Sequence, residues 1–265
     1  MKKNLFLLIM FAALLGMQTS CNQKKETTGE VKTNADSVVV KSKFGDYSIL
    51  VDVPQSGNKM LNDAILEYAS ETLGGNYYDD IANANGMLKF YCDSISKAFD
   101  EFGKELAENS SSEDTIRMEY EARIVKKYET PKLVTYANTC YMFTGGAHGS
   151  TINSGATFRK SDGRHITWDS FKDFDSDGFS QLIIEGLKKY FNVETDEQLA
   201  ENLLVDIKNQ PLPRPKSAPE FGPDGVTFTY QQYEIAAYAA GIPTATVPYE
   251  KIKPFMLASA AKLLE

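Results

Sequence analysis

Positive charge, histidine and cysteine are all scarce in this sequence, and each shortage excludes a class of function. The chain has 28 Lys and Arg against 36 Asp and Glu, which gives a formal net charge of −8 at pH 7. An acidic chain repels phosphate backbones, so we expect no nucleic-acid partner. The two histidines cannot build a His-rich zinc site, and no HExxH motif or cysteine pair lies near them. We therefore expect no cofactor.

Long apolar runs are equally scarce, and the one clear run lies at the N-terminus. Lys2 and Lys3 precede an uninterrupted apolar stretch at residues 5–15, and Cys21 follows shortly afterwards. This stretch is too short to span a bilayer comfortably, whereas a basic start, a short apolar segment and small residues before a cysteine are typical of a lipoprotein signal peptide. We predict that residues 1–20 are removed and that Cys21 carries the lipid.

One residue departs from that pattern, because Gln18 occupies a position where Leu is usual. The alternative is an ordinary secretory peptide with an incidental cysteine. Lipidation predicts a body held outside the cytoplasm in the cell envelope, periplasmic or surface-exposed, with Cys21 as its link to the membrane. Loss of Lys2 and Lys3 with the signal peptide changes the net charge from −8 to −10.

Two cysteines remain after cleavage, Cys92 in a helical segment and Cys140 in a strand. Apolar residues recur at helical spacing on the Cys92 face and at alternate positions beside Cys140, so both thiols are predicted to be buried. A compartment outside the cytoplasm permits a disulfide between them. Buried free cysteine is equally ordinary, and proximity cannot be read from sequence, so the pairing stays open.

The chain divides into a tether and two domains. Residues 21–35 are polar and lack periodicity, which predicts a flexible tether. We place a first domain at residues 36–160 and a second at residues 161–265. Helices mixed with mainly antiparallel strands predict an α+β fold, with helices packed on the sheets of two small α/β-mixed domains.

Hydrophobic periodicity locates the individual elements. In residues 116–124, apolar side chains at even positions alternate with charged side chains at odd positions, the pattern of a half-buried antiparallel strand. Residues 210–221 are proline-rich and are expected to form an extended crossing or loop. The other expected strands are 38–44, 47–53, 133–143, 152–160, 225–231 and 244–248; the expected helices are 61–68, 87–106, 179–191, 195–207 and one from about residue 249.

Three stretches carry a family resemblance: YMFTGGAHGS at residues 141–150, TFRKSDGRHITWDSFKDF at 157–174, and GVTFTYQQYEIAAYAAGIPTATVPYEKI at 225–252. Together they resemble the paired extracytoplasmic domains of unknown function in RsiV-type anti-sigma factors. The first domain is also similar to the one in front of the catalytic domain of PdaC-type peptidoglycan deacetylases. The resemblance implies an α+β body with a GGAH loop and, in RsiV-type members, lysozyme binding outside the membrane.

The sequence departs from both kinds of protein. It has no cytoplasmic sigma-binding segment, no transmembrane helix and no deacetylase domain, so we expect neither sigma-factor regulation nor deacetylation. The expected partner stays open between a protein such as lysozyme and a cell-wall glycan.

The GGAH loop supplies the first candidate binding residues, Gly145, Gly146, Ala147 and His148. Glycines on both sides of the histidine permit positive φ and let the imidazole approach a partner or another strand. One interpretation makes His148 a ligand contact or a catalytic base. The other makes it a satisfied histidine that hydrogen-bonds a neighbouring loop and fixes the strand connection.

Tyrosines of the second domain supply further candidates. Tyr230, Tyr233, Tyr238 and Tyr249 cluster there, and tyrosine suits both sugar stacking and protein interfaces. Tyrosine is also common in β-rich cores, which is the competing interpretation. We select Tyr233 and Tyr238 as binding residues together with the GGAH loop.

The acidic string at residues 173–178 is a weak candidate for a calcium site. Asp173, Asp175 and Asp177 stand at positions one, three and five of an EF-hand loop, but position twelve is Ile184 instead of a bidentate glutamate. The favoured interpretation is a solvated turn whose aspartates cap the helix that follows.

No catalytic residue is predicted. A glycosidase needs two carboxylates about 5 to 10 Å apart, whereas Glu119 and Glu121 are expected on the wet face of a strand, and Gly149-Ser150 only distantly resembles a GxSxG elbow. The sequence predicts a non-enzymatic, lipid-anchored protein of the cell envelope that binds or senses a protein or a cell-wall glycan. The alternative is a hydrolase acting on cell-wall carbohydrate.

Overall fold

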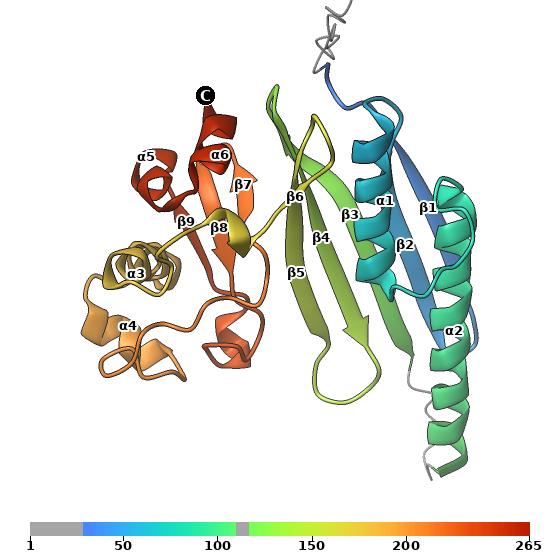
Figure 1. Ribbon diagram of the computed structural model, residues 1–265. Helices are drawn as coiled ribbons and strands as arrows, with labels where there is room; N and C mark the ends of the chain where they lie inside the picture. Colours follow the sequence, from blue (N-terminus) through green and yellow to red (C-terminus); the bar gives the residue numbers. More distant parts are fainter. Residues whose placement is uncertain (1–28, 110–116) are drawn as a thin grey trace, which may run out of the picture.

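The computed structural model describes residues 29–109 and 117–265. Two sheets, each with its own helices, lie side by side (Figure 1), and this arrangement confirms the expected α+β class. The larger sheet has the order β1-β2-β3-β4-β5-β6, and the smaller has the order β7-β8-β9. The predicted signal peptide, Cys21 and residues 21–28 of the predicted tether lie outside the described residues.

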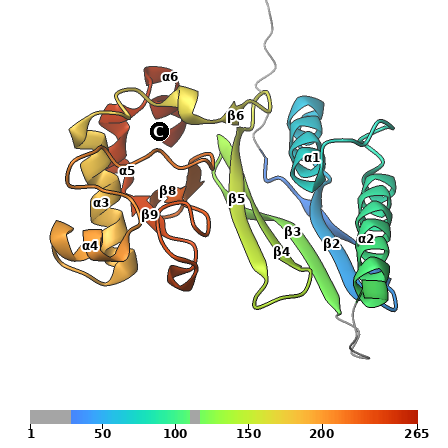
Figure 2. The ribbon, with the colours of Figure 1, turned by 90° about the horizontal axis from the view of Figure 1, so that it is seen from below.

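The first half of the chain forms the larger sheet. Its strands are β1 (Thr33–Lys41), β2 (Gly45–Pro54), β3 (Met118–Glu129), β4 (Leu133–Phe143), β5 (Ser150–Arg159) and β6 (His165–Ile166). β2 and β3 run parallel, and every other neighbouring pair is antiparallel. Parallel neighbours need a long crossover, which contains α1 (Lys59–Leu73) and α2 (Ala84–Asn109). Both helices cover the face that points away from the smaller sheet (Figure 2).

The core of this half follows from the alternation along β2. Tyr47, Ile49 and Val51 are fully buried, and the residues between them are partly exposed. They share one hydrophobic cluster with Ile65 of α1 and Met87 of α2. Burying one large apolar side chain contributes roughly 1.5–3 kcal/mol, so this repeated pattern holds the helices on the sheet.

The folded chain begins earlier than the sequence indicates. Residues 33–35, which we expected in the flexible tether, start β1 and pair with residues 52–54 of β2. Val31 is fully buried; its amide donates to Glu129 Oε1 at 2.8 Å, and its carbonyl oxygen accepts from Lys126 Nζ at 2.7 Å. A polar sequence suits an edge strand because one side of such a strand faces water.

The second half of the chain builds the smaller sheet, whose strands are β7 (Glu220–Gly222), β8 (Gly225–Thr229) and β9 (Thr244–Val247). Its α-helices are α3 (Asp177–Phe191), α4 (Asp196–Asn202), α5 (Tyr249–Ile252) and α6 (Ala258–Ala261), and its 3-10 turns are η1 (Trp168–Ser170), η2 (Tyr238–Ala240), η3 (Lys253–Phe255) and η4 (Lys262–Leu264). β6 falls in the range that we assigned to the second domain, but it pairs with β5 in the larger sheet.

Two helices are shorter than their periodicity predicts. α4 ends at Asn202 instead of residue 207, because the Leu204 amide leaves the helical path and donates to the carbonyl oxygen of Ile235 at 2.8 Å. The expected C-terminal helix breaks after Ile252 into short segments, because Pro254 cannot continue the hydrogen-bond ladder. None of the helices in the described part of the chain is long and apolar enough to cross a membrane.

Buried threonines join the two halves. Thr135 Oγ1 of β4 donates to the carbonyl oxygen of Phe221 in β7 at 2.8 Å, and the Phe221 amide donates to Thr157 Oγ1 of β5 at 3.0 Å. Leu133 of β4 packs in the hydrophobic core of the second half. These contacts seat β7 on the open face of β4 and β5.

Cys92 and Cys140 are both free thiols. Cys92 is fully buried as expected, whereas Cys140 is partly exposed. Burial raises the pKa of each thiol, and a raised pKa disfavours the reactive thiolate.

Candidate binding surface at the GGAH loop

The GGAH loop connects β4 to β5 at the end of the larger sheet that is nearest η2 (Figure 1). Gly145 and Gly146 have φ values of 96° and 100°, a region that other residues rarely adopt. A Cβ added at Gly146 would meet nothing within 4 Å. The requirement for glycine at Gly146 is therefore conformational and not steric.

Gly149, at the end of the loop, is needed for a different reason. A Cβ at this position would lie 2.4 Å from Cε2 of Tyr141, so the Tyr141 ring packs directly on the Gly149 backbone. The Gly149 carbonyl oxygen accepts from the Tyr238 hydroxyl at 2.9 Å and lies 3.0 Å from Nδ1 of His148. One backbone group thus ties the loop of the first half to η2 of the second half.

The aromatic side chains complete this junction. The His148 and Tyr238 rings are stacked, with centroids 3.8 Å apart and planes at 20°. The Tyr233 ring centroid lies 5.8 Å from that of Tyr238. The structure therefore brings together the GGAH loop and the two tyrosines that the sequence indicated, and we call residues 145–149, Tyr233 and Tyr238 the GGAH surface.

Tyr233 is an exposed residue of the GGAH surface, with 59% of its area accessible. Its φ of 64° places a bulky residue in the left-handed region, at a cost on the order of 1–3 kcal/mol. The turn that imposes this conformation is closed by Glu234, whose carboxylate accepts from the backbone amides of Gln231 at 2.7 Å and Lys216 at 2.8 Å. The backbone therefore fixes the direction in which the exposed side chain leaves the chain.

Two glutamines that sequence reasoning missed seal the strand beside the surface. Gln232 Oε1 accepts from the Thr151 amide at 3.0 Å. Gln231 Oε1 accepts from the Asn153 amide at 3.1 Å, and its Nε2 donates to the Asn153 carbonyl oxygen at 2.6 Å. Their side-chain amides replace a neighbouring strand along β5. The signal in the sequence was the Gln-Gln pair one residue beyond the strand at residues 225–229, since a primary amide can donate and accept like a peptide group.

The other two candidate tyrosines belong to the core. The buried Tyr230 donates its hydroxyl to the carbonyl oxygen of Pro213 at 2.8 Å, and Tyr249 donates to that of Gly222 at 2.6 Å. Burial raises the pKa of both phenols. The competing structural interpretation therefore holds for Tyr230 and Tyr249.

The second histidine is also structural. His165 packs against Phe158 with ring centroids 5.3 Å apart, and against Tyr68 at 6.2 Å. Burial lowers the pKa of His165, because removal from water disfavours the charged imidazolium.

The acidic string lies in a turn before α3. The residue that caps α3 is Ser176, whose hydroxyl oxygen accepts from the Phe179 amide at 3.3 Å. This corrects the expectation that aspartates cap the helix, although Asp177 does lie in its first turn. Ile184 points into the second core. Within residues 29–109 and 117–265, no three His, Cys, Asp or Glu side chains gather in a group that could hold a metal ion.

Two carboxylates that could be considered for a catalytic pair, Glu121 and Glu220, are each ion-paired. Glu121 pairs with Arg123 at 3.5 Å on the open face of β3. Glu220 is only 6% exposed and lies under Gly155, where it pairs with Lys127 at 3.4 Å. Burial raises the pKa of Glu220, and the Lys127 ammonium opposes that rise. Both groups have structural partners.

Neither element of a serine hydrolase is present at the GGAH surface in the described residues. His148 has a backbone carbonyl as its hydrogen-bond partner there, and no carboxylate orients it. Ser150 sits in regular β5 opposite Met142 of β4, whereas a nucleophile elbow requires a strained turn.

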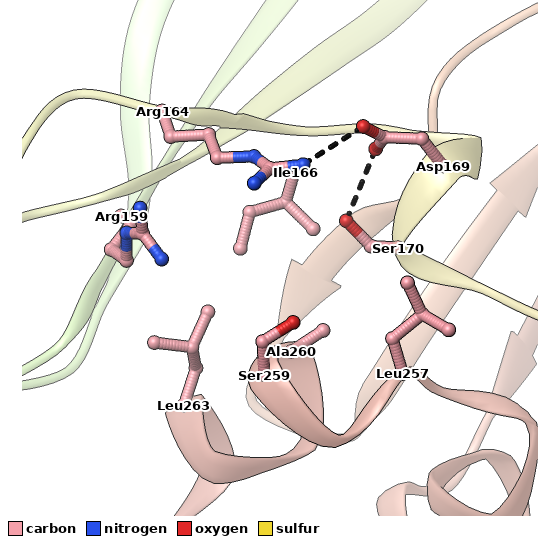
Figure 3. Close-up of a pocket in the computed structure, with 9 residues that line it drawn as sticks. All are labelled: Arg159, Arg164, Ile166, Asp169, Ser170, Leu257, Ser259, Ala260 and Leu263. Atoms are coloured by element: carbon pink, nitrogen blue, oxygen red, sulfur yellow. Dashed lines mark hydrogen bonds and ion pairs between the residues drawn. The ribbon is translucent and has the colours of Figure 1, made fainter.

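A small pocket lies elsewhere, where the β5–β6 hairpin meets the C-terminal segment (Figure 3). Its volume is about 30 Å³, which suits water rather than a sugar or a peptide. The Arg159 guanidinium binds Asp162 in a bidentate pair, and Arg164 binds Asp169 at 2.9 Å. Both guanidinium groups are thus already neutralised, and the pocket is best explained as part of the junction between the two halves.

Comparison with known proteins finds a family match within the second half of the chain. Residues 171–250 match the family model described as "Protein of unknown function (DUF3298)". The fold is similar to the crystal structure of a DUF3298 family member from Bacteroides fragilis, with a TM-score of 0.70 and 18% identity over 88% of this chain and 98% of that one. A DUF3298 family protein from Pseudomonas aeruginosa has a TM-score of 0.54 and 14% identity over the same shares. These identities establish a shared fold alone. No curated protein matches the chain.

Proposed function

We propose that this chain, which carries a DUF3298 region, is a non-enzymatic binding or sensing protein of the cell envelope. It is anchored to a membrane through lipidated Cys21, and it engages a protein such as lysozyme or a cell-wall glycan through the GGAH surface. The observation that carries the proposal is the aromatic cluster of His148, Tyr238 and Tyr233, in which the first two rings are stacked and which is built from both halves of the chain.

The geometry of this stack supports a binding role. Tyrosine supplies a large contact area and loses little conformational freedom when it binds. Tyr238 is held by the His148 ring and by its bond to Gly149, and the Tyr233 ring lies beside that of Tyr238. A surface ordered before the ligand arrives has less entropy to lose on binding.

Hydrolysis of cell-wall carbohydrate is the weaker alternative. It requires an acid and a second carboxylate across a cleft. Glu234, the carboxylate in the turn that carries Tyr233, accepts two backbone amides and acts as a clamp.

The sequence resembles the paired extracytoplasmic domains of RsiV-type anti-sigma factors and, over residues 36–160, the PdaC-type domain. That resemblance supports an extracellular protein ligand, with lysozyme as the first candidate. The anchor is tested by Cys21→Ala, which should release the body from membranes or leave it unprocessed. Equal fractionation of mutant and parent, with neither incorporating labelled lipid, would rule out lipidation.

The binding role is tested with Tyr233→Ala, using lysozyme and purified peptidoglycan as separate probes. The matched control is Tyr78→Ala, which removes a tyrosine that is 93% exposed in the loop between α1 and α2. We expect Tyr233→Ala to weaken binding at least tenfold, about 1.4 kcal/mol, with an unchanged melting temperature, and Tyr78→Ala to bind like the parent. Equal binding by both variants, or release of soluble sugar from peptidoglycan by the parent, would refute the proposal.

A further inference from the structure

A second concave surface lies on the far side of η2, between α3 and β9. Its volume is about 380 Å³, which falls within the range of about 300–1,000 Å³ for small-molecule sites. It is lined by Gly186, Lys189 and Tyr190 of α3, Thr244 and Thr246 of β9, and Asp224 of the β7–β8 turn.

Gly186 sets how closely α3 approaches β9 beside the groove. A Cβ at this position would approach the Ala245 Cβ to 2.6 Å, so the absent side chain lets α3 and β9 pack closely. No side chain rises from Gly186 into the groove. One helical turn later, Tyr190 forms the wall.

Tyr190 is fixed in place before any ligand binds. Its hydroxyl donates to the Ala240 carbonyl oxygen at 2.7 Å, and its ring meets that of Phe191 edge-on, with centroids 5.1 Å apart. The residue still exposes 39% of its area. The result is a rigid aromatic wall with an accessible surface.

The polar groups of the groove offer both donors and acceptors. Lys189 and Asp224 are exposed, and neither forms an ion pair with another described residue. Thr246 bonds Thr227 through their hydroxyls at 2.9 Å, which leaves further hydrogen-bonding capacity on each oxygen. One cation and one anion balance, so the groove does not select a charged ligand.

We infer that this groove binds one pyranose unit of a glycan, a neutral or N-acetylated hexose. A pyranose combines an apolar C–H face with a rim of hydroxyls that donate and accept hydrogen bonds. The C–H face suits the Tyr190 ring, and the hydroxyls suit Asp224, Lys189 and the threonines.

The inference goes beyond the proposed function because the groove does not include the GGAH surface. The two sites share only η2, in which Tyr238 stacks on His148 and Ala240 holds Tyr190. A glycan in the groove would therefore bind without displacing a protein from the GGAH surface.

The test is calorimetric titration of the full chain in detergent with N-acetylchitotetraose and with cellotetraose. We expect saturable binding of at least one of these sugars, weakened about tenfold by Tyr190→Ala. Tyr78→Ala should bind like the parent, and Tyr233→Ala is measured in parallel to separate this groove from the GGAH surface. Tyr190→Ala also removes the hydrogen bond to Ala240, so a second variant, Asp224→Asn in the exposed β7–β8 turn, is needed. Asp224→Asn should weaken sugar binding while the melting temperature stays unchanged.

Absence of saturable binding to both sugars overturns the inference. So does parental affinity in both Tyr190→Ala and Asp224→Asn. Loss of sugar binding in Tyr233→Ala alone would move the glycan to the GGAH surface, which also overturns the inference but leaves the proposed function standing.

Discussion

Replacing His148 with alanine separates a structural role of the histidine from a role in contacting a partner. The substitution removes the stack on Tyr238, and aromatic pairs are worth about 0.5–1.5 kcal/mol beyond their buried area. It also removes the Nδ1 bond to Gly149, worth about 0.5 kcal/mol at an exposed position. We expect His148→Ala to lower the free energy of unfolding by roughly 1–2 kcal/mol.

The assay is urea unfolding of a double-mutant cycle between His148 and Tyr238. Since the two rings touch, Tyr238→Ala and His148→Ala should be coupled by about 0.5–1.5 kcal/mol. His148→Phe is the matched control, because it keeps a ring for stacking and loses only the Nδ1 bond. It should recover most of the lost stability. A coupling energy of zero, or equal losses for alanine and phenylalanine, would refute the reasoning.

The His148→Ala variant is then tested for binding to lysozyme and to peptidoglycan. If His148 pins the loop against η2 and Tyr233 makes the contact, affinity should match the parent once the unfolded fraction is subtracted. A normally folded His148→Ala protein with at least tenfold weaker binding, about 1.4 kcal/mol, would assign the imidazole to the contact itself.

Three further predictions concern backbone, pH and metal. Gly146→Val should lower the free energy of unfolding by roughly 1–3 kcal/mol, because φ is 100° at that position. Gly178→Ala, at a helical position with ordinary contacts, should not lower it. Equal thermal melts for the two variants would contradict this prediction. Burial raises the pKa of Glu220 above its ordinary 4.5. The protonated Glu220 side chain therefore contributes stability below pH 4.5, and this contribution is lost as pH rises through the pKa of the folded state. Glu220→Gln should therefore lose less stability than the parent between pH 4.5 and about pH 7 in urea titrations, and identical pH profiles would argue against it. About 1 mM calcium should leave the melting temperature unchanged; a large rise that Asp175→Ala abolishes would reveal a calcium site in the acidic turn.

The local pattern of the sequence was sufficient for most elements. Alternation at residues 116–124 and 133–143 predicted β3 and β4, and helical spacing predicted α1 and α2. The glycines of the GGAH loop predicted positive φ, which Gly145 and Gly146 adopt. These features follow from the sequence because periodicity and glycine chemistry act over a few neighbouring residues.

Long-range contacts decided the features of the fold that the local sequence pattern did not predict. The parallel pairing of β2 with β3, the end of α4 where Leu204 turns to Ile235, and the sealing of β5 by Gln231 each depend on a partner far along the chain. The pairing of Cys92 with Cys140 was likewise left open by the sequence, and both are free in the fold.

The GGAH surface was likewise predicted in part from the sequence and decided in part by the tertiary structure. The sequence by itself named the GGAH loop and two tyrosines, because glycine and tyrosine have distinctive chemistry at any position. Only the tertiary structure decided that Tyr238 reaches a carbonyl group 89 residues away, that Tyr233 faces solvent and that Tyr230 is buried. The physical reason is that exposure and stacking depend on how the two sheets pack, and the bonds from the buried threonines of β4 and β5 to the Phe221 backbone of β7 set that packing.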